Sequence, residues 1–427
     1  MTETGKHVLR AAAAPPRLMA AAARGGWRRQ RRAGVTAVPL AAVAVAGLLA
    51  SGTGVRAGQA QPGPAPAGGG FTAYVVGTGA NGGIANHVTP INTATNRPGK
   101  AIKAGGQPVA IAITPDGKTA YVADFFSGTV TPIATATNTP GKPIKAGRGP
   151  AVIAVTPDGK TVYVGNAGSN TVTPIATATN IPGKPIKAGN QPNAILITPD
   201  GKTVYVADTG SDTVTPIATA TNTPGKPIKV GPNPIMLAVT PNGKTVYAAN
   251  SGVLSPASGS TVTPIATATN TPGKPIKVGT DPRYIAITPD GRTAYVASGL
   301  ANTVTPIATA TNTPGKPIKT PVYPWRIAIT PDGKTVYVAD DRKNLVHNAP
   351  GLVTPIATAT NTAGKPIKVG LDPLAIAVTP DGKTVYVVCA GTETVIPIAT
   401  ATNTAGKPIK VGGSPTAIAF VPRPARS

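Results

Sequence analysis

The chain has 427 residues with 50 glycines and 48 prolines, yet 41% of its residues are apolar, which excludes wholesale disorder. Only 13% are charged, with 40 Lys and Arg against 15 Asp and Glu. A single cysteine excludes an internal disulfide framework and any multi-cysteine metal centre, and three histidines leave little material for metal or acid–base chemistry.

The first sixty residues are predicted to be an export signal. Seven arginines precede an apolar run at residues 35–50, and small residues follow, with cleavage expected after Ala57 or Ala60. The run is short for a membrane span, but an uncleaved anchor stays open, as does the choice between Sec and twin-arginine export. Residues 61–70 form a Pro/Gly linker. We therefore expect a protein that is secreted or held at the cell surface or cell wall, with no membrane span after cleavage.

Residues 71–422 repeat one unit. Its Pro-Asp-Gly or Pro-Asn-Gly turn recurs from Pro115 to Pro380 in steps of 42 residues, apart from two steps of 48 and 49. Such a period is typical of a four-stranded propeller blade. Within one unit, β-type runs at 194–197, 203–207, 213–218 and 227–230 are separated by turn signals. We name these runs strands a, b, c and d.

The two ends of the repeat are predicted to close a ring. The repeat opens with strands b, c and d only, at 71–76, 88–91 and 101–103, and ends with an isolated strand a at 416–420. Pairing of these ends would complete a composite blade and leave few free edges. We expect an all-β propeller of eight four-stranded blades over residues 71–422, with seven blades as the alternative and 423–427 as a tail.

Every strand c contains a proline, as at Pro132, Pro216 and Pro306. Proline cannot donate to a strand ladder. We therefore predict a break or bulge at this position, with strand d pairing incompletely along strand c.

Three recurring motifs carry a family resemblance: Thr198–Gly201, Tyr163–Asn166 and Thr219–Asn222. Repeated across residues 71–420, they resemble the YVTN-family β-propeller repeats. The resemblance implies a propeller of the kind found in secreted and surface-layer proteins, with lactonase-like propellers as more distant relatives. It brings no catalytic residue, and strand c departs from the family pattern in its Thr-Pro-Ile run.

The net charge is concentrated on strand d. Without residues 1–60 the chain keeps 31 basic and 14 acidic residues, and sixteen of the basic ones are paired lysines such as Lys142 and Lys145. Lysines on an outer edge prevent pairing with strands of other molecules. The alternative is a basic rim that adheres to an anionic cell-wall polymer. Nucleic acid is disfavoured, because strand d offers no aromatic side chain on which bases could stack.

The b–c and d–a loops share one face of a propeller, here called the upper face, and they vary most between the units. Loops on a rigid scaffold usually carry binding. Aromatic and arginine side chains, which dominate binding hot spots, gather on two adjacent units, with a separate Phe-Phe pair elsewhere. The alternative is that Tyr323 and Trp325 pack a long loop. The candidate ligand-binding residues are Arg283, Tyr284, Tyr323, Trp325, Arg326, Asp340, Asp341, Arg342, His347, Phe125 and Phe126.

Little else in the sequence points to chemistry. His87 and His347 fall in units that are not neighbours, so we predict no metal site, no cofactor and no catalytic residue. Cys389 is predicted to be a partly buried loop thiol, with pairing between molecules as the alternative. We expect a non-enzymatic binding or cell-surface module for a protein or glycan. Its alternatives are a propeller enzyme of lactonase or lyase type and a structural wall component.

Overall fold

The computed structural model describes residues 70–79, 86–252, 260–340 and 349–422, which belong to one compact unit of the chain. They form strands and turns without a helix, so no helix among them has the length and apolarity to cross a membrane. The predicted signal and tail lie outside the described residues, as does the linker apart from Gly70.

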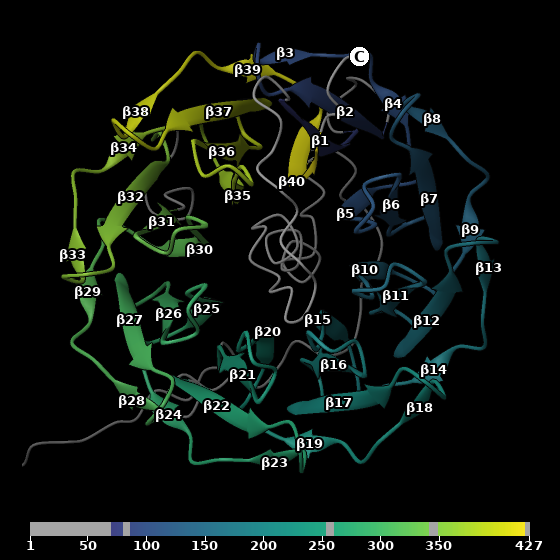
Figure 1. Cartoon of the computed structure of the whole chain (residues 1–427), viewed down its shortest axis with the longest axis horizontal. Helices are drawn as coiled ribbons and strands as arrows, with labels where there is room; N and C mark the ends of the chain where they lie inside the picture. Colours follow the sequence, from purple (N-terminus) through teal and green to yellow (C-terminus); the bar gives the residue numbers. More distant parts are fainter. Residues whose placement is uncertain (1–69, 80–85, 253–259, 341–348, 423–427) are drawn as a thin grey trace, which may run out of the picture. The chain divides into compact units, whose positions relative to one another are not determined.

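The strands form eight antiparallel sheets arranged as the blades of a ring (Figure 1). Strand a lies innermost, strands b and c follow, and strand d forms the circumference. Each strand a contacts the strands a of the two adjacent blades, and this contact continues around the whole ring. The predicted eight-bladed all-β propeller is confirmed, and the seven-bladed alternative is wrong.

The three inner strands of each blade are regular. Strands a are β5 (Pro108–Ile113), β10 (Pro150–Val155), β15 (Pro192–Ile197), β20 (Pro234–Val239), β25 (Pro282–Ile287), β30 (Pro324–Ile329), β35 (Pro373–Val378) and β40 (Ser414–Pro422). Strands b are β1 (Phe71–Thr78), β6 (Thr119–Asp124), β11 (Thr161–Asn166), β16 (Thr203–Asp208), β21 (Thr245–Asn250), β26 (Thr293–Ser298), β31 (Thr335–Asp340) and β36 (Thr384–Cys389). Strands c are β2 (His87–Asn92), β7 (Thr129–Ala134), β12 (Thr171–Ala176), β17 (Thr213–Ala218), β22 (Thr261–Ala266), β27 (Thr303–Ala308), β32 (Leu352–Ala357) and β37 (Thr394–Ala399).

The outer strand d is broken into two short pieces in every blade. In one blade, Ile217 and Ala218 pair with the first piece and Thr213 and Val214 with the second, so the pairing stops on both sides of Pro216. The first pieces are β3 (Arg97–Pro98), β8 (Thr139–Pro140), β13 (Ile181–Pro182), β18 (Thr223–Pro224), β23 (Thr271–Pro272), β28 (Thr313–Pro314), β33 (Thr362–Ala363) and β38 (Thr404–Ala405). The second pieces are β4 (Ile102–Lys103), β9 (Ile144–Lys145), β14 (Ile186–Lys187), β19 (Ile228–Lys229), β24 (Ile276–Lys277), β29 (Ile318–Lys319), β34 (Ile367–Lys368) and β39 (Ile409–Lys410).

This break confirms the effect expected of the strand-c proline, which offers no N–H to the ladder. The turn that the sequence predicts between strands c and d, over residues 221–225, is wrong in part, because Thr223 and Pro224 pair with strand c. Strand d is correspondingly shorter at its other end than residues 227–230, since only Ile228 and Lys229 are paired there. The carbonyl of Pro216 is still used, because it accepts a bond of 2.8 Å from the Gly225 N–H.

The composite blade is built as predicted. β40 pairs antiparallel with β1, which brings Phe71 opposite Pro422, and β1 pairs with β2. Strands from the two ends of the repeat therefore share one sheet, and their pairing closes the ring (Figure 1).

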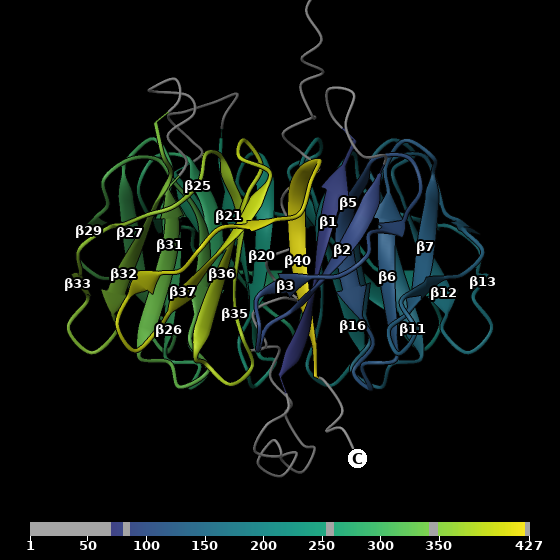
Figure 2. The same cartoon turned by 90° about the horizontal axis from the view of Figure 1, so that it is seen from above.

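The core lies between the blades. Strand b is buried along nearly its whole length, as in Val204–Asp208, because neighbouring blades cover both of its faces. A strand covered on both faces is expected to be apolar throughout rather than alternating. Figure 2 shows the ring from its edge, with the turns gathered at two opposite faces. The a–b and c–d turns lie on the face that we call the lower face.

A hydrogen bond joins each blade to the next. The tyrosine of every strand b donates its hydroxyl proton to the asparagine of the Thr-Ala-Thr-Asn turn in the following blade, over 2.5–2.7 Å. The set includes the bond from Tyr386 to Asn96, which crosses the closure of the ring. The tyrosines are thus interblade core residues, as the sequence predicts.

Candidate functional site

A buried carboxylate lies where β25 begins, at the upper face. Asp281 is 1% exposed, and its Oδ2 accepts two hydrogen bonds, from Arg283 Nε at 2.7 Å and from the Tyr323 hydroxyl at 3.0 Å. Its other oxygen, Oδ1, is buried without a hydrogen-bond partner. Buried polar atoms are nearly always bonded, so this oxygen has the capacity to accept a hydrogen bond from a water molecule or a ligand.

Aromatic rings and guanidinium groups pack against this carboxylate. The Tyr323 and Trp325 rings are stacked with 5.9 Å between their centroids, and the Arg283 guanidinium lies 5.1 Å from the Trp325 ring centroid. Arg326, which is 2% exposed, lies 4.9 Å from the same ring and 5.5 Å from that of Tyr284. Such cation–π contacts hold positive charge where water is scarce. The name Asp281 cluster is used below for Asp281, Arg283, Tyr284, Tyr323, Trp325 and Arg326.

Backbone strain is found in the same cluster. Tyr323 directly precedes strand a and has a φ of 40°, in the left-handed region. Most units place Asn, Asp, Gln or Gly at this position, whereas a bulky ring there costs on the order of 1–3 kcal/mol. The Tyr323 N–H donates to Asn302 Oδ1 over 2.7 Å. Gly299 makes room for the ring, because a Cβ atom at Gly299 would lie 3.0 Å from it.

The phenols of the cluster stay protonated near neutral pH. Burial raises the pKa of Tyr323 to about 12, with Arg283 acting in the opposite direction. Burial also raises the pKa of Tyr284 well above its usual range. The Tyr284 hydroxyl and the Trp325 indole N–H are buried without hydrogen-bond partners. The cluster therefore contains two unused donors and one unused carboxylate oxygen.

The blade that contains β25 also departs from the regular pattern at the end of its strand b. In a regular blade, Asn166 Nδ2 donates to Thr173 at 2.9 Å and to Thr171 at 3.2 Å. Ser298 occupies this position in β26, and it is too short to do the same. The hydroxyls of Ser298, Thr303 and Thr305 are consequently buried without hydrogen-bond partners.

Five of the predicted ligand-binding residues are brought into contact: Arg283, Tyr284, Tyr323, Trp325 and Arg326. Four of them are buried and the Arg283 side chain is 11% exposed, so they form a packed cluster, which differs from the exposed loop surface that the sequence suggested. Their role in ligand binding stays a prediction. Asp281 was not among the candidates, although its place between a d–a loop and Pro282, two residues before Arg283, was a visible signal.

The remaining candidates lie elsewhere. Asp340 ends β31 and accepts a bond of 2.8 Å from Thr354, whereas Asp341, Arg342 and His347 lie outside the described residues. Phe125 and Phe126 follow β6, across the ring from β25, so the structure does not bring them into the cluster (Figure 1). Their rings are 5.7 Å apart, and Phe126 is 71% exposed.

The cysteine and the described histidine have structural surroundings. Cys389 is wholly buried at the end of β36, which corrects the prediction of a partly buried loop thiol. Burial raises the pKa of its thiol to about 12, so it is held in the unreactive protonated form. His87 Nε2 is 3.0 Å from the Val411 carbonyl oxygen. Within the described part of the chain, no group of three or more His, Cys, Asp or Glu side chains is placed to hold a metal ion.

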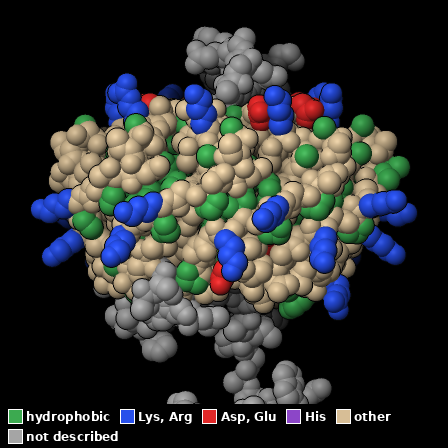
Figure 3. All heavy atoms as spheres, turned by 90° about the horizontal axis from the view of Figure 1, so that it is seen from below, with side chains coloured by type: hydrophobic (Ala, Val, Ile, Leu, Met, Phe, Trp, Pro, Cys, Tyr) green, Lys and Arg blue, Asp and Glu red, His purple; other side chains and the backbone are tan. Residues whose placement is uncertain are grey.

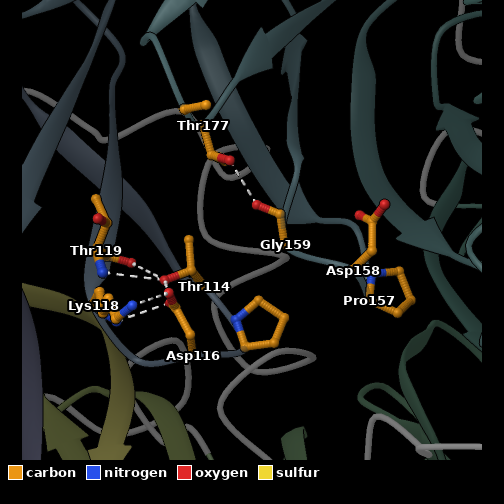
Figure 4. Close-up of a pocket in the computed structure, with 10 residues that line it drawn as sticks. Thr114, Asp116, Lys118, Thr119, Pro157, Asp158, Gly159 and Thr177 are labelled. Carbon is orange, nitrogen blue, oxygen red and sulfur yellow. Dashed lines mark hydrogen bonds and ion pairs between the residues drawn. The ribbon is translucent and has the colours of Figure 1, made fainter.

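A pocket of about 540 Å³ lies at the lower face and has a different character (Figure 4). It is lined by the a–b turns of two adjacent blades, including Asp116 and Asp158. Its polar atoms already bond within the turns, as in Thr114 to Asp116 at 2.6 Å and Thr177 to the Gly159 carbonyl at 2.7 Å (Figure 4). Because the same turn recurs around the ring, this pocket belongs to the architecture, and the Asp281 cluster is the better candidate site.

Comparison with known proteins finds one family model and several solved structures that resemble the chain. Residues 127–223 match the family model described as "Lactonase, 7-bladed beta-propeller", which is less than a quarter of the chain. No curated protein sequence matches the chain. Its structure resembles a hydrazine synthase structure from Kuenenia stuttgartiensis, with a TM-score of 0.57, 25% identity, and coverage of 70% of this chain and 97% of the other.

Two further structures share the fold at lower identity. The dihydro-heme d1 dehydrogenase NirN gives a TM-score of 0.67 at 16% identity, over 85% of this chain and 80% of the other. A "putative 6-phosphogluconolactonase" from Bacteroides fragilis gives 0.56 at 18% identity, over 84% of this chain and 99% of the other.

These findings correct the prediction of a non-enzymatic protein. The match of residues 127–223 to the lactonase family model is evidence against that prediction, because the model describes a family of propeller enzymes. The prediction rested on the scarcity of histidine and glutamate. It overlooked that a buried aspartate held by arginine and tyrosine can supply acid–base chemistry without either residue.

Proposed function

We propose that this protein is a lactonase-type hydrolase that opens a cyclic ester at the Asp281 cluster. The observation that carries the proposal is the asymmetric carboxylate of Asp281: Oδ2 is fixed by Arg283 and Tyr323, while Oδ1 is unbonded. A general base needs a lone pair aimed at a water molecule and a fixed orientation. The match of residues 127–223 to the lactonase family model supports the reaction class.

In the proposed reaction, Asp281 Oδ1 takes a proton from a water molecule as the water oxygen attacks the acyl carbon of the lactone. The carbonyl oxygen then gains negative charge, which the guanidinium of Arg283 stabilises. The ring C–O bond breaks, and the leaving alkoxide takes the proton back from Asp281. The product is an open hydroxy acid, and no further reactant is needed.

The other members of the cluster position these groups. The Tyr323 hydroxyl, protonated because burial raises its pKa to about 12, keeps Oδ2 occupied and leaves Oδ1 for water. The stacked Tyr323 and Trp325 rings enclose the ion pair between Arg283 and Asp281 and limit its solvation. A charged pair acts more strongly where water is excluded.

The test is hydrolysis of a panel of γ-, δ- and ε-lactones by the full chain, followed as release of the hydroxy acid. Asp281→Asn keeps the size of the side chain but removes the base, and kcat/KM is expected to fall by about 10²-fold or more. Asp372→Asn is the matched control, because Asp372 occupies the same position before strand a but Leu374 stands two residues later, where the Asp281 unit has Arg283. Failure to hydrolyse any of the three ring sizes contradicts the proposal, as does equal loss in both variants.

A further inference from the structure

The circumference of the ring carries a continuous belt of unpaired lysines. Every strand d contributes two, as in Lys142 and Lys145, and all sixteen are exposed. Between each pair a buried isoleucine such as Ile144 fixes the segment to the blade. Figure 3 shows Lys and Arg side chains distributed along the outer surface.

The belt runs without interruption from blade to blade. The second piece of each strand d contacts the first piece in the next blade, as β9 contacts β13 and β14 contacts β18, and β39 contacts β3 across the closure. No lysine of the belt forms an ion pair within the described residues, where the paired lysines all follow a–b turns. Sixteen uncompensated charges thus lie along one closed path.

Protection of the blade edges does not require so many charges. Each outer strand is already broken by the strand-c proline into pieces of two residues, which cannot template a partner strand. In most blades the first piece also contains a proline, such as Pro140, and the second piece directly follows one, such as Pro143. The lysines are therefore available for another use.

We propose that this belt binds a flexible linear polyanion of the phosphate type, which follows the circumference of the ring. Lysine acts as a point charge that attracts phosphate, and binding to many lysines at once releases counterions. Double-stranded nucleic acid, with a persistence length of about 500 Å, is too stiff to follow a small ring. Single-stranded nucleic acid would gain little, because strand d carries no aromatic side chain for stacking. The inference is independent of the lactonase proposal.

The probe for the test is long-chain inorganic polyphosphate, and the measurement is its affinity for the full chain as a function of salt. The belt variant carries Lys145→Gln and the same change in the second lysine of each other strand d. Its affinity is expected to fall at least about tenfold at moderate salt, and the slope of log K against log salt to fall by about half.

The matched control removes nearly the same charge from another surface. It carries Lys160→Gln and the same change at the other basic residues that follow a–b turns. Both variants keep residues 1–60, so the arginines there contribute equally. The control is expected to bind polyphosphate almost as tightly as the unchanged chain.

Three outcomes would overturn the inference. Equal loss in the two variants would mean attraction by net charge alone, and full binding by the belt variant would leave the lysines with edge protection only. Tighter binding of duplex DNA than of polyphosphate would identify a nucleic-acid surface instead. Should the belt variant fail to fold, four changes in alternate blades, at Lys145, Lys229, Lys319 and Lys410, test the same expectation with a smaller loss.

Discussion

The a–b turns at the lower face and the Asp281 cluster at the upper face differ in how completely their polar side chains are hydrogen-bonded. At the lower face, Asp116 Oδ1 accepts bonds from the Thr114 hydroxyl at 2.6 Å and the Lys118 N–H at 3.0 Å, and this arrangement recurs around the ring. The hydrogen bond from Thr114 helps to hold the pKa of Asp116 below its usual value. At the upper face, the Asp281 cluster has a carboxylate oxygen, a phenol and an indole N–H without partners. Repeated contacts build the scaffold, whereas the Asp281 cluster is built from residues that depart from the repeat.

The contact between Gly299 and Tyr323 gives the largest expected effect. Gly299→Ala places a Cβ atom 3.0 Å from the Tyr323 ring and 3.1 Å from Asp281 Oδ2. The ring must shift, so the free energy of unfolding is expected to fall by about 1–3 kcal/mol and lactone hydrolysis by about tenfold or more. Urea unfolding and kcat/KM measure the two effects.

A second substitution checks the cause. The regular units combine a side chain at the position of Gly299 with a smaller residue at that of Tyr323, as in Thr209 with Asn233. Gly299→Ala combined with Tyr323→Asn should regain the stability but not the activity. If Gly299→Ala alone unfolds and turns over like the unchanged protein, the ring is not confined as described.

Within the regular blades, a buried carboxylate introduces a pH dependence. Burial raises the pKa of Asp124 to about 6, so between about pH 4 and 6 the folded state binds more protons than the unfolded state. The contribution of the protonated Asp124 side chain to stability is therefore complete below about pH 4 and is lost as the pH rises through 6. Asp124→Asn is expected to raise the free energy of unfolding by up to about 3 kcal/mol at pH 8 and by little at pH 4.

The reciprocal variant is the control for this prediction. Asn166 has the same position in the next blade, and its Oδ1 accepts a bond of 3.0 Å from Gly147, as Asp124 accepts one of 3.1 Å from Gly105. Asn166→Asp should introduce the loss that Asp124→Asn removes. Identical urea midpoints for Asp124→Asn and the unchanged protein at pH 8 would rule the effect out.

The unpaired hydroxyls of β27 give a smaller expected effect. The same substitution, Thr to Val, is expected to stabilise this blade and to destabilise a regular one. Thr305→Val removes a buried hydroxyl that has no partner and should stabilise the protein by about 1 kcal/mol. Thr173→Val removes the partner of Asn166 and should destabilise it by about 1–2 kcal/mol. Thermal unfolding of both variants decides the matter, and a shift of the same sign in both would show that the two blades do not differ here.

The smallest effect is expected at the hydrogen bonds between blades. Tyr205→Phe deletes the bond of 2.5 Å to Asn270, which is exposed and can turn to water, so the expected loss is about 0.5–1.5 kcal/mol. Tyr386→Phe should cost the same, although it crosses the closure of the ring. A much larger loss at Tyr386 would mean that the ring opens there first.

The architecture could be predicted because the sequence repeats the same structural unit around the whole ring. Each unit repeats its turns, its strand-b tyrosine and its strand-c proline, so one interpretation was tested against seven copies of itself. Strand d was predicted less well: the pairing of Thr223 and Pro224 depends on how the chain passes Pro216, which local turn propensity does not contain.

The site was harder to predict because it depends on departures from the repeat. Arg283, Tyr323 and Trp325 were found as unusual residues, but their burial and stacking depend on contacts between two blades. Asp281 was missed because aspartate also stands at Asp372, so its type alone does not distinguish it. Only the approach of Arg283 and Tyr323 to one of its oxygens gives it a chemical role.

The composite blade formed by the two ends of the repeat has a consequence for how the number of blades can change. Only the composite blade combines the two ends of the repeat, through β1 and β40. Each of the seven remaining blades is therefore encoded by one contiguous stretch of about 42 residues. A gene duplication or deletion of one such stretch would add or remove a whole blade and leave the pairing of β1 with β40 unchanged. Chains with different blade counts would then arise in single genetic events, and this eight-bladed ring matches a seven-bladed family model over residues 127–223.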